Sequence, residues 1–211
     1  MKFNPFPRSA AAALMAMTLN VGCGSQQPSG GGIAASAQAE ACPPEANLLQ
    51  DAEFATLAGG PKRVWGARQH SRGQDFRATA DAGLLTIEKI GHEPWFVMSQ
   101  RVDREFPAGT ELQYDALLTL DTHEPKDRHG FGYVSGLHLV GKSGRRSVVR
   151  ATGEHEPNIG QHPEQRVVSR VTPATAISQI DVGFIHQAGG KFTVREPRLV
   201  DLSRYPQCRL P

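Results

Sequence analysis

The chain has 211 residues, of which 23 are Lys or Arg and 21 are Asp or Glu, so its formal net charge is +2. Two of the basic residues, Lys2 and Arg8, lie in a segment that we expect to be removed, which leaves 21 basic against 21 acidic residues. This balance leaves no basic stripe for phosphate contacts, and we therefore predict no nucleic-acid partner.

Residues 1–22 have the layout of a secretory signal, in which a basic stretch ending at Arg8 precedes the apolar run "SAAAALMAMTLNVG". The run is too short for a spanning helix, which needs about 20 residues. The segment "LNVGC" resembles the lipobox of bacterial lipoproteins, although Asn20 replaces the usual aliphatic residue. This resemblance implies a lipid on Cys23 and, because Gly24 rather than Asp follows, an outer-membrane location in the bacterial envelope. The alternative is an ordinary cleaved signal.

Residues 23–41 are rich in Gly, Ser, Ala and Gln and have few large apolar side chains, so we expect a flexible tether. Export would place Cys42 and Cys208, at the two ends of the expected domain 42–208, in an oxidising compartment. We predict a disulfide between them, worth about 4 to 5 kcal/mol in chain-entropy treatments. Two free buried thiols are the alternative.

Short segments with the two-residue alternation of strands recur along residues 42–208, separated by turn clusters such as "FPAGT" and "QAGGK". No stretch keeps a helical period. We therefore predict an all-β fold, a single antiparallel β-sandwich or jelly roll. The expected strands are "NLLQDAEF", "GLLTIEKI", "WFVMSQRV", "ELQYDALLTL", "FGYVSGLHLV", "SVVRA", "RVVSRV", "ISQIDVGFIH" and "KFTVREPRLV".

Three of these stretches resemble the family 4/9-type carbohydrate-binding modules: "NLLQDAEF", "PWFVMSQRVDREFPAGTELQYDALL" and "IDVGFIHQAGGKFTVREPRLVDL". The resemblance spans about residues 46–202 and implies a galactose-binding-like jelly roll with a glycan ligand. Many members hold a structural calcium. Asp51, Glu53 and Asp201 fall at matching places and offer oxygen ligands, so the resemblance implies a calcium site there, unless they are solvated carboxylates at strand ends.

Two tryptophans offer the aromatic faces with which glycan-binding sites stack on pyranose rings. Trp65, in "KRVWGARQH", has polar neighbours that suit sugar hydroxyls, and we predict it as the principal contact, with Arg63, Arg68 and Gln69 beside it. Trp95 is either a second platform or a cap on the core. Because the chain has no G-x-S-x-G elbow and no H-E-x-x-H, we predict that it is not an enzyme.

The triplet HEP occurs three times, starting at His92, His123 and His155, which composition does not explain. Counting antiparallel strands places all three, with His129, His162 and His186, at one end of the sandwich. Imidazoles and carboxylates suit zinc, copper or nickel, so a transition-metal site on the three triplet histidines is one interpretation. The favoured interpretation is that the triplets are polar residues and prolines that end strands. A third interpretation is a polar rim that binds sugar or peptide.

These features together predict a non-catalytic, lipid-anchored protein of the cell envelope whose β-sandwich domain binds a glycan. Two alternatives remain open. The domain is a structural or protein-interaction module without sugar binding, or it is a divalent-metal-binding accessory lipoprotein that uses the His-rich loop end.

Overall fold

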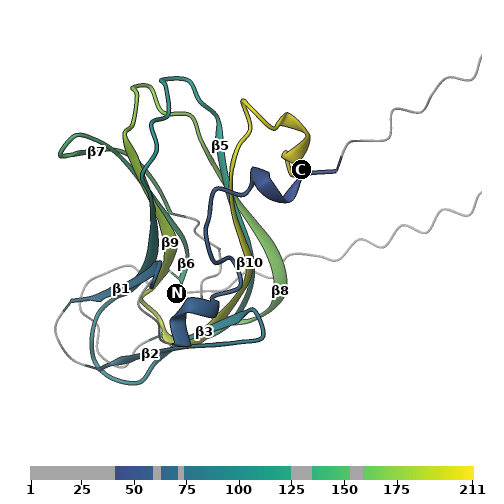
Figure 1. The fold of residues 1–211 in the computed structure, drawn as a ribbon. Helices are drawn as coiled ribbons and strands as arrows, with labels where there is room; N and C mark the ends of the chain where they lie inside the picture. Colours follow the sequence, from purple (N-terminus) through teal and green to yellow (C-terminus); the bar gives the residue numbers. More distant parts are fainter. Residues whose placement is uncertain (1–40, 59–62, 71–73, 125–134, 153–158) are drawn as a thin grey trace, which may run out of the picture. The chain divides into compact units, whose positions relative to one another are not determined.

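The computed structural model describes residues 41–58, 63–70, 74–124, 135–152 and 159–211. Two five-stranded antiparallel sheets form a β-sandwich of jelly-roll type (Figure 1), which confirms the predicted fold class. Sheet A has the strand order β2-β3-β10-β5-β8, and sheet B has the order β1-β4-β9-β6-β7. Residues 38–211 make up one compact unit.

The strands and short 3-10 helices have the following bounds: η1 Pro44–Ala46, η2 Ala55–Ala58, β1 Trp65–Gln69, β2 Phe76–Asp81, β3 Leu84–Lys89, β4 Phe96–Val102, β5 Leu112–His123, β6 Ser135–Ser143, β7 Arg146–Thr152, β8 Gly160–Val171, β9 Gln179–His186, β10 Gly189–Asp201 and η3 Pro206–Cys208. No helix in the described ranges is long and apolar enough to cross a membrane.

The core lies between the sheets and follows directly from strand alternation. In β5, Tyr114, Ala116 and Leu118 face inward and are fully buried. The Tyr114 hydroxyl donates a hydrogen bond to the carbonyl of Gly183 in β9, with an O–O distance of 2.9 Å, and so joins the two sheets. Because burial raises the pKa of this hydroxyl well above its ordinary value, with a smaller contribution from Asp115, it remains a donor.

The predicted first strand, "NLLQDAEF", is wrong. Asn47 makes an isolated β-bridge with Val200, but Asp51 and Phe54 have positive φ angles of 42° and 58°, which interrupt an extended backbone. The Asn47 side chain fixes this segment to β10 instead, because its Oδ1 accepts the Leu199 N–H at 3.1 Å. Two strands that we did not predict, β1 and β2, complete the edges of the sheets.

The predicted disulfide is confirmed. Cys42 and Cys208 are bonded, with a Cα–Cα distance of 4.6 Å, so the two ends of the described domain lie side by side (Figure 1). Cys208 packs with Ala46, Val200 and Leu202 in a small apolar cluster separate from the main core. The bridge therefore closes nearly the whole folded segment into one covalent loop.

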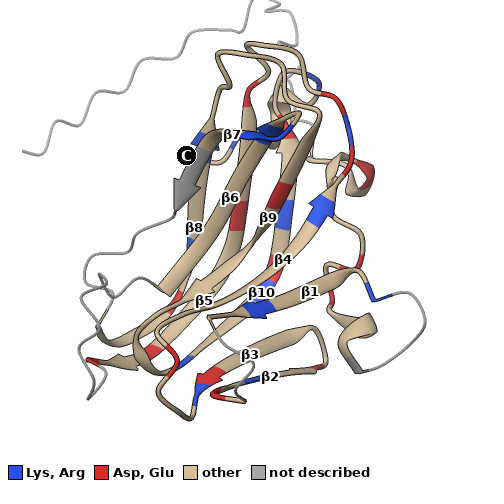
Figure 2. Ribbon diagram, turned by 90° about the vertical axis from the view of Figure 1, so that its left-hand side faces the viewer, with Lys and Arg blue, Asp and Glu red and all other residues tan. Residues whose placement is uncertain are grey.

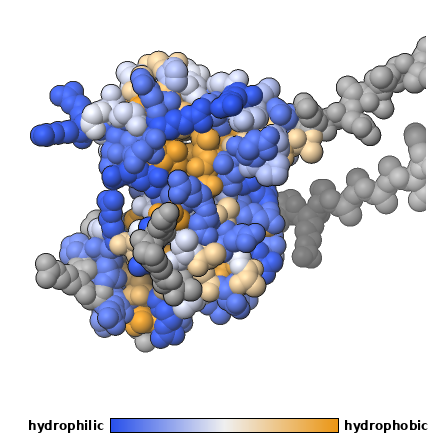
Figure 3. Space-filling view, in the orientation of Figure 1, coloured by the Kyte–Doolittle hydropathy of each residue, from blue (hydrophilic) through white to orange (hydrophobic). Residues whose placement is uncertain are grey.

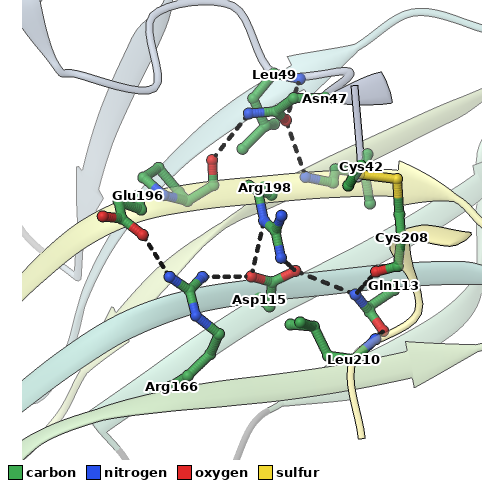
Figure 4. A network of polar contacts seen from close by, with 12 residues as sticks. Cys42, Asn47, Leu49, Gln113, Asp115, Arg166, Glu196, Arg198, Cys208 and Leu210 are labelled. Atoms are coloured by element: carbon green, nitrogen blue, oxygen red, sulfur yellow. Dashed lines mark hydrogen bonds and ion pairs between the residues drawn. A yellow bond between two sulfur atoms is a disulfide. The ribbon is translucent and has the colours of Figure 1, made fainter. Parts of the chain in front are cut away.

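Polar side chains on the outer face of sheet A form a closed network (Figure 4). Asp115 in β5 is fully buried and accepts hydrogen bonds from Arg166 at 2.7 Å and Arg198 at 3.1 Å. Beside it, Gln113 donates to the Cys208 carbonyl at 3.2 Å and accepts the Leu210 N–H at 3.1 Å. This network holds the C-terminal segment across the sheet.

Candidate functional site

Four histidines of the predicted group, His92, His123, His162 and His186, lie at one end of the sandwich, as strand counting predicts. On β10, Gly189 lies opposite His123, and Gly190 lies opposite Lys89. Lys89 is the last residue of β3, and His92 follows it three residues later in the chain. His162 pairs with Leu120 near the same end of β5, and His186 pairs with Phe96 at the start of β4. The third triplet, with His155, lies outside the described residues.

The metal sites expected from the sequence are not assembled in the described part of the chain, where no group of three or more His, Cys, Asp or Glu could hold an ion. The transition-metal set therefore lacks a described third partner for His92 and His123. The calcium set is not formed either. Asp51 accepts the Ala55 N–H at 2.7 Å and Asp201 accepts the Ser203 N–H at 3.1 Å, so these carboxylates cap turns, while Glu53 is exposed.

Trp65 is not the exposed ring that we predicted. It is fully buried, its ring centroid lies 5.7 Å from that of Phe184, and its Nε1–H donates to the Asp51 carbonyl at 2.8 Å. The reason is the side-chain alternation of β1, which directs Trp65 into the core and Gly66 and Arg68 to the outer face of sheet B.

Two glycines and a serine lie in one row across the outer face of sheet B, and a histidine continues that row. Gly66, Ser99, Gly183 and His138 are consecutive cross-strand partners on β1, β4, β9 and β6. A side chain at Gly183 would place its Cβ 1.9 Å from the Met98 carbonyl oxygen, so only glycine fits there. Because two of the four positions have no side chain, the row forms the floor of a shallow trough across the strands.

Two of the predicted ligand contacts, Arg68 and Trp95, line a depression of about 270 Å³ on this face. Its other lining residues are Val97, Ser99, His138, Val140, Lys142 and Asp181. Arg63 and Gln69 do not line it, because Arg63 precedes β1 and Gln69 has the opposite side-chain parity to Arg68. We call the depression together with the adjoining row of Gly66, Ser99 and Gly183 the sheet B trough.

The first HEP triplet supports Trp95. Glu93 is 8% exposed and its carboxylate lies 3.5 Å from Nδ1 of His70. The His70 ring in turn meets the Trp95 ring edge-on, with centroids 6.5 Å apart. Pro94 restricts the backbone between Glu93 and Trp95. The triplet thus positions an aromatic ring at the rim of the trough, a role that the sequence pattern alone did not indicate.

Asp181, which the sequence analysis missed, organises the opposite side of the trough. Its carboxylate lies 3.0 Å from Nζ of Lys142 and 3.3 Å from Nε of Arg101. Burial alone would raise the pKa of Asp181, but hydrogen bonds and charge attraction from these two cations outweigh it and hold that pKa below its ordinary value. In Figure 2, β1 and β4 each carry a blue segment, at Arg68 and Arg101 respectively.

A larger depression of about 840 Å³ lies between η2, the β2–β3 turn and the bulge of β10. Its main polar groups serve the fold: Arg198 binds the buried Asp115, and Asn47 donates to the Pro197 carbonyl at 3.1 Å. Its one aromatic residue, Phe54, is fully buried. It therefore presents no ring to a ligand, and we place the candidate site in the smaller sheet B trough.

The rest of the described surface offers little apolar area. Figure 3 shows a mainly hydrophilic face with small apolar areas, and among the described residues the exposed large hydrophobic side chains are Ile90 and Val148. A broad apolar docking surface is thus missing from the described part of the chain, and polar recognition in the trough is the stronger candidate.

No protein-family model matches the chain, and a search of curated proteins finds no match. Among solved structures it is similar to the enzymatically active domain of tailspike protein 4 of bacteriophage CBA120, with a TM-score of 0.52 and 8% identity over 75% of this chain. The chain spans 22% of that tailspike chain. At this identity the likeness concerns the fold, a β-sandwich.

Two carbohydrate-binding modules show weaker likeness. The CBM22-1 xylan-binding domain from Paenibacillus barcinonensis has a TM-score of 0.43 and 12% identity, with 67% of this chain and 88% of that domain covered. TmCBM61, solved in complex with beta-1,4-galactotriose, has a TM-score of 0.40 and 14% identity, with 74% of this chain and 98% of that chain covered. Likeness at this level does not identify a ligand of this chain.

Proposed function

We propose that the protein is a non-catalytic glycan-binding module whose site is the sheet B trough. The observation that carries this proposal is the meeting of Trp95 and Arg68 in one depression, beside a row that contains Gly66, Ser99 and Gly183. An aromatic ring at the rim of a shallow polar groove is the arrangement with which proteins bind the apolar face and the hydroxyls of a sugar.

Different residues of the trough contact the ring face and the hydroxyls of the sugar. The indole of Trp95 stacks on a pyranose ring, and the first HEP triplet, with His70, holds that indole in place. Arg68 and Ser99 offer hydrogen bonds to the sugar along the strands. A volume of about 270 Å³ in an open face admits part of a longer chain, so a polysaccharide that crosses the strands is a better ligand than an isolated monosaccharide.

A lipid on Cys23 and a tether of residues 23–41 complete the proposal, and would place the module at the bacterial envelope, on the outer membrane. The support for this part is the "LNVGC" segment and the Gly/Ser/Ala/Gln-rich composition that follows. Mass spectrometry of the mature protein tests it directly: we expect an acylated N-terminal Cys23, and an unmodified Cys23 or cleavage elsewhere would refute the anchor.

Glycan binding is tested with the soluble unit Gln38–Pro211 on an array of polysaccharides, with isothermal titration of the best ligand. Trp95→Ala should weaken binding by about 2 kcal/mol, roughly thirtyfold, because the stacking surface is lost. Ile90→Ala is the control, because Ile90 is at the same end of the domain and is 51% exposed; this variant should bind as tightly as the unmodified protein. Binding that survives Trp95→Ala would exclude this site.

A further inference from the structure

Positive charges outnumber negative charges in the sheet B trough. On the four strands that form it, β1, β4, β9 and β6, the charged side chains are Arg68, Arg101, Lys142 and Asp181. Three of them are cations and one is an anion. Strand alternation and the ion pairs at Asp181 place all four on the outer face.

Asp181 does not neutralise this excess. It is shared between Lys142 and Arg101, at 3.0 Å and 3.3 Å, so that the group of three keeps a net positive charge. Arg68 makes no ion pair with any described residue, and it is exposed. Arg68 lies opposite Val97, four residues before Arg101 on β4, which separates the two cationic positions by about 13 Å along the strand.

Hydrogen-bond donors also outnumber acceptors there. The guanidinium of Arg68 and the ammonium of Lys142 only donate. The one carboxylate, Asp181, already accepts from Arg101 at 3.3 Å and from Gln179 at 3.2 Å, in addition to its contact with Lys142. The Ser99 hydroxyl and the His138 ring can each accept a hydrogen bond, but the cations only donate, so a carboxylate or sulfate group, which only accepts, matches them better than a sugar hydroxyl does.

We infer that the ligand of the trough is an acidic polysaccharide, whose carboxylate or sulfate groups contact Arg68 at one position and the Lys142 and Arg101 pair at the other while a sugar ring stacks on Trp95. This inference rests on the proposed function and narrows it to one class of glycan. Charge-assisted hydrogen bonds to two separated cations would select a polymer with repeated anionic groups.

The test compares polymers that share a backbone and differ in charge. The unit Gln38–Pro211 is titrated with polygalacturonate and with its methyl-esterified form, and with dextran sulfate and dextran. The first pair reports on carboxylates and the second on sulfates. We expect the acidic member of at least one pair to bind at least tenfold more tightly than its neutral partner, and added salt to weaken that binding.

Arg68→Gln should weaken binding of the acidic polymer about tenfold, and Arg77→Gln, on β2 of sheet A, is the matched control that should have no effect. Equal loss in both variants would mean unspecific attraction and overturn the inference. Trp95-dependent binding of a neutral polymer at least as tight as that of its acidic partner would overturn the inference and leave the proposed function standing. If neither these polymers nor an array of neutral, uronate-bearing and sulfated glycans binds, both fail.

Discussion

The outer faces of the two sheets use charge in opposite ways. On sheet A, Asp115 is fully buried and is closed in by Arg166 and Arg198, while Gln113 binds the C-terminal segment. On sheet B, Arg68 is exposed and makes no ion pair with a described residue, beside a floor that includes two glycines. Polar groups that the chain itself satisfies stabilise the fold, whereas those left open are available to a ligand.

The largest effect on stability is expected from breaking the closed face. Asp115→Asn removes the charge that compensates two partly buried guanidinium groups, and should lower the free energy of unfolding by about 3 kcal/mol. Urea denaturation measures this change. Asp121→Asn, at an exposed position on the same strand, is the control and should change stability by less than about 0.5 kcal/mol. A loss below about 1 kcal/mol for Asp115→Asn would mean that the network is not important for stability.

The next effect concerns the link between the sheets at His186, which is fully buried. Its Nε2–H donates to the Gly190 carbonyl at 3.1 Å, and its Nδ1 therefore accepts the Ser135 hydroxyl at 2.7 Å. The pKa of His186 is lowered from 6.5 to about 4, chiefly by burial; the hydrogen bond to Gly190 opposes this shift, and the nearby charges of Lys89 and His123 add to it.

Between these two pKa values the unfolded chain binds a proton at this histidine and the folded chain does not. Stability should therefore fall as the pH decreases from about 6.5 to about 4, by up to roughly 3 kcal/mol. Urea denaturation across this range measures the slope. His186→Gln should flatten it, and His92→Gln, at an exposed position, should keep it. An unchanged slope in His186→Gln would assign the pH dependence to other groups.

A pair of glycine substitutions separates the two roles of the trough floor. Gly183→Ala would place its Cβ 2.6 Å from Cα of Ser99 as well as against Met98, and should cost about 1 to 3 kcal/mol. Gly66→Ala meets the Ser99 carbonyl at an ordinary 3.7 Å and should leave stability unchanged within about 0.5 kcal/mol. Thermal denaturation distinguishes the two variants. If Gly183→Ala lost no more stability than Gly66→Ala, a backbone shift would have relieved the close approach at Gly183.

The smallest effect on stability is expected for Arg68→Gln, below about 0.5 kcal/mol, because the side chain is exposed and makes no ion pair with a described residue. Its effect should appear in polysaccharide affinity instead. Asp115→Asn should show the opposite pattern under conditions in which the protein is still folded. A destabilised Arg68→Gln variant with unchanged affinity would remove the distinction between the two faces.

The alternation of apolar and polar residues made most of the fold predictable, because alternation reports directly which side chains face a core. The disulfide was predictable because Cys42 and Cys208 lie at the two ends of the folded part, and because the export that we expect from the first 22 residues would favour their oxidation. The edge strand β1 was missed because Gly66 and Arg68 face outward and give "WGARQ" a polar composition. That composition also made Trp65 look exposed, although its strand parity directs it inward.

The site was only partly predictable. Arg68 and Trp95 were identified as candidates, but their meeting depends on the pairing of β1 with β4, which alternation alone does not specify. Asp181 could have been noticed as a charge between Ile180 and Val182, at an outward position of an apolar strand. The calcium expectation was wrong because resemblance in sequence position says nothing about whether Asp51 and Asp201 are already occupied by backbone N–H groups.

The Cys42–Cys208 bridge also determines how the domain would bear a pulling force. The Cys208 carbonyl accepts a hydrogen bond from Gln113, near the start of β5, on the outer side of sheet A. Trp95 lies at the opposite end, on the outer side of sheet B, next to Phe96, which pairs with His186. A chain that pulls on Cys42 while a polymer is held in the trough would load the domain along its diagonal. Because the bridge passes that force to Cys208 and the end of β10, the central strand of sheet A, the N-terminal segment cannot peel away alone.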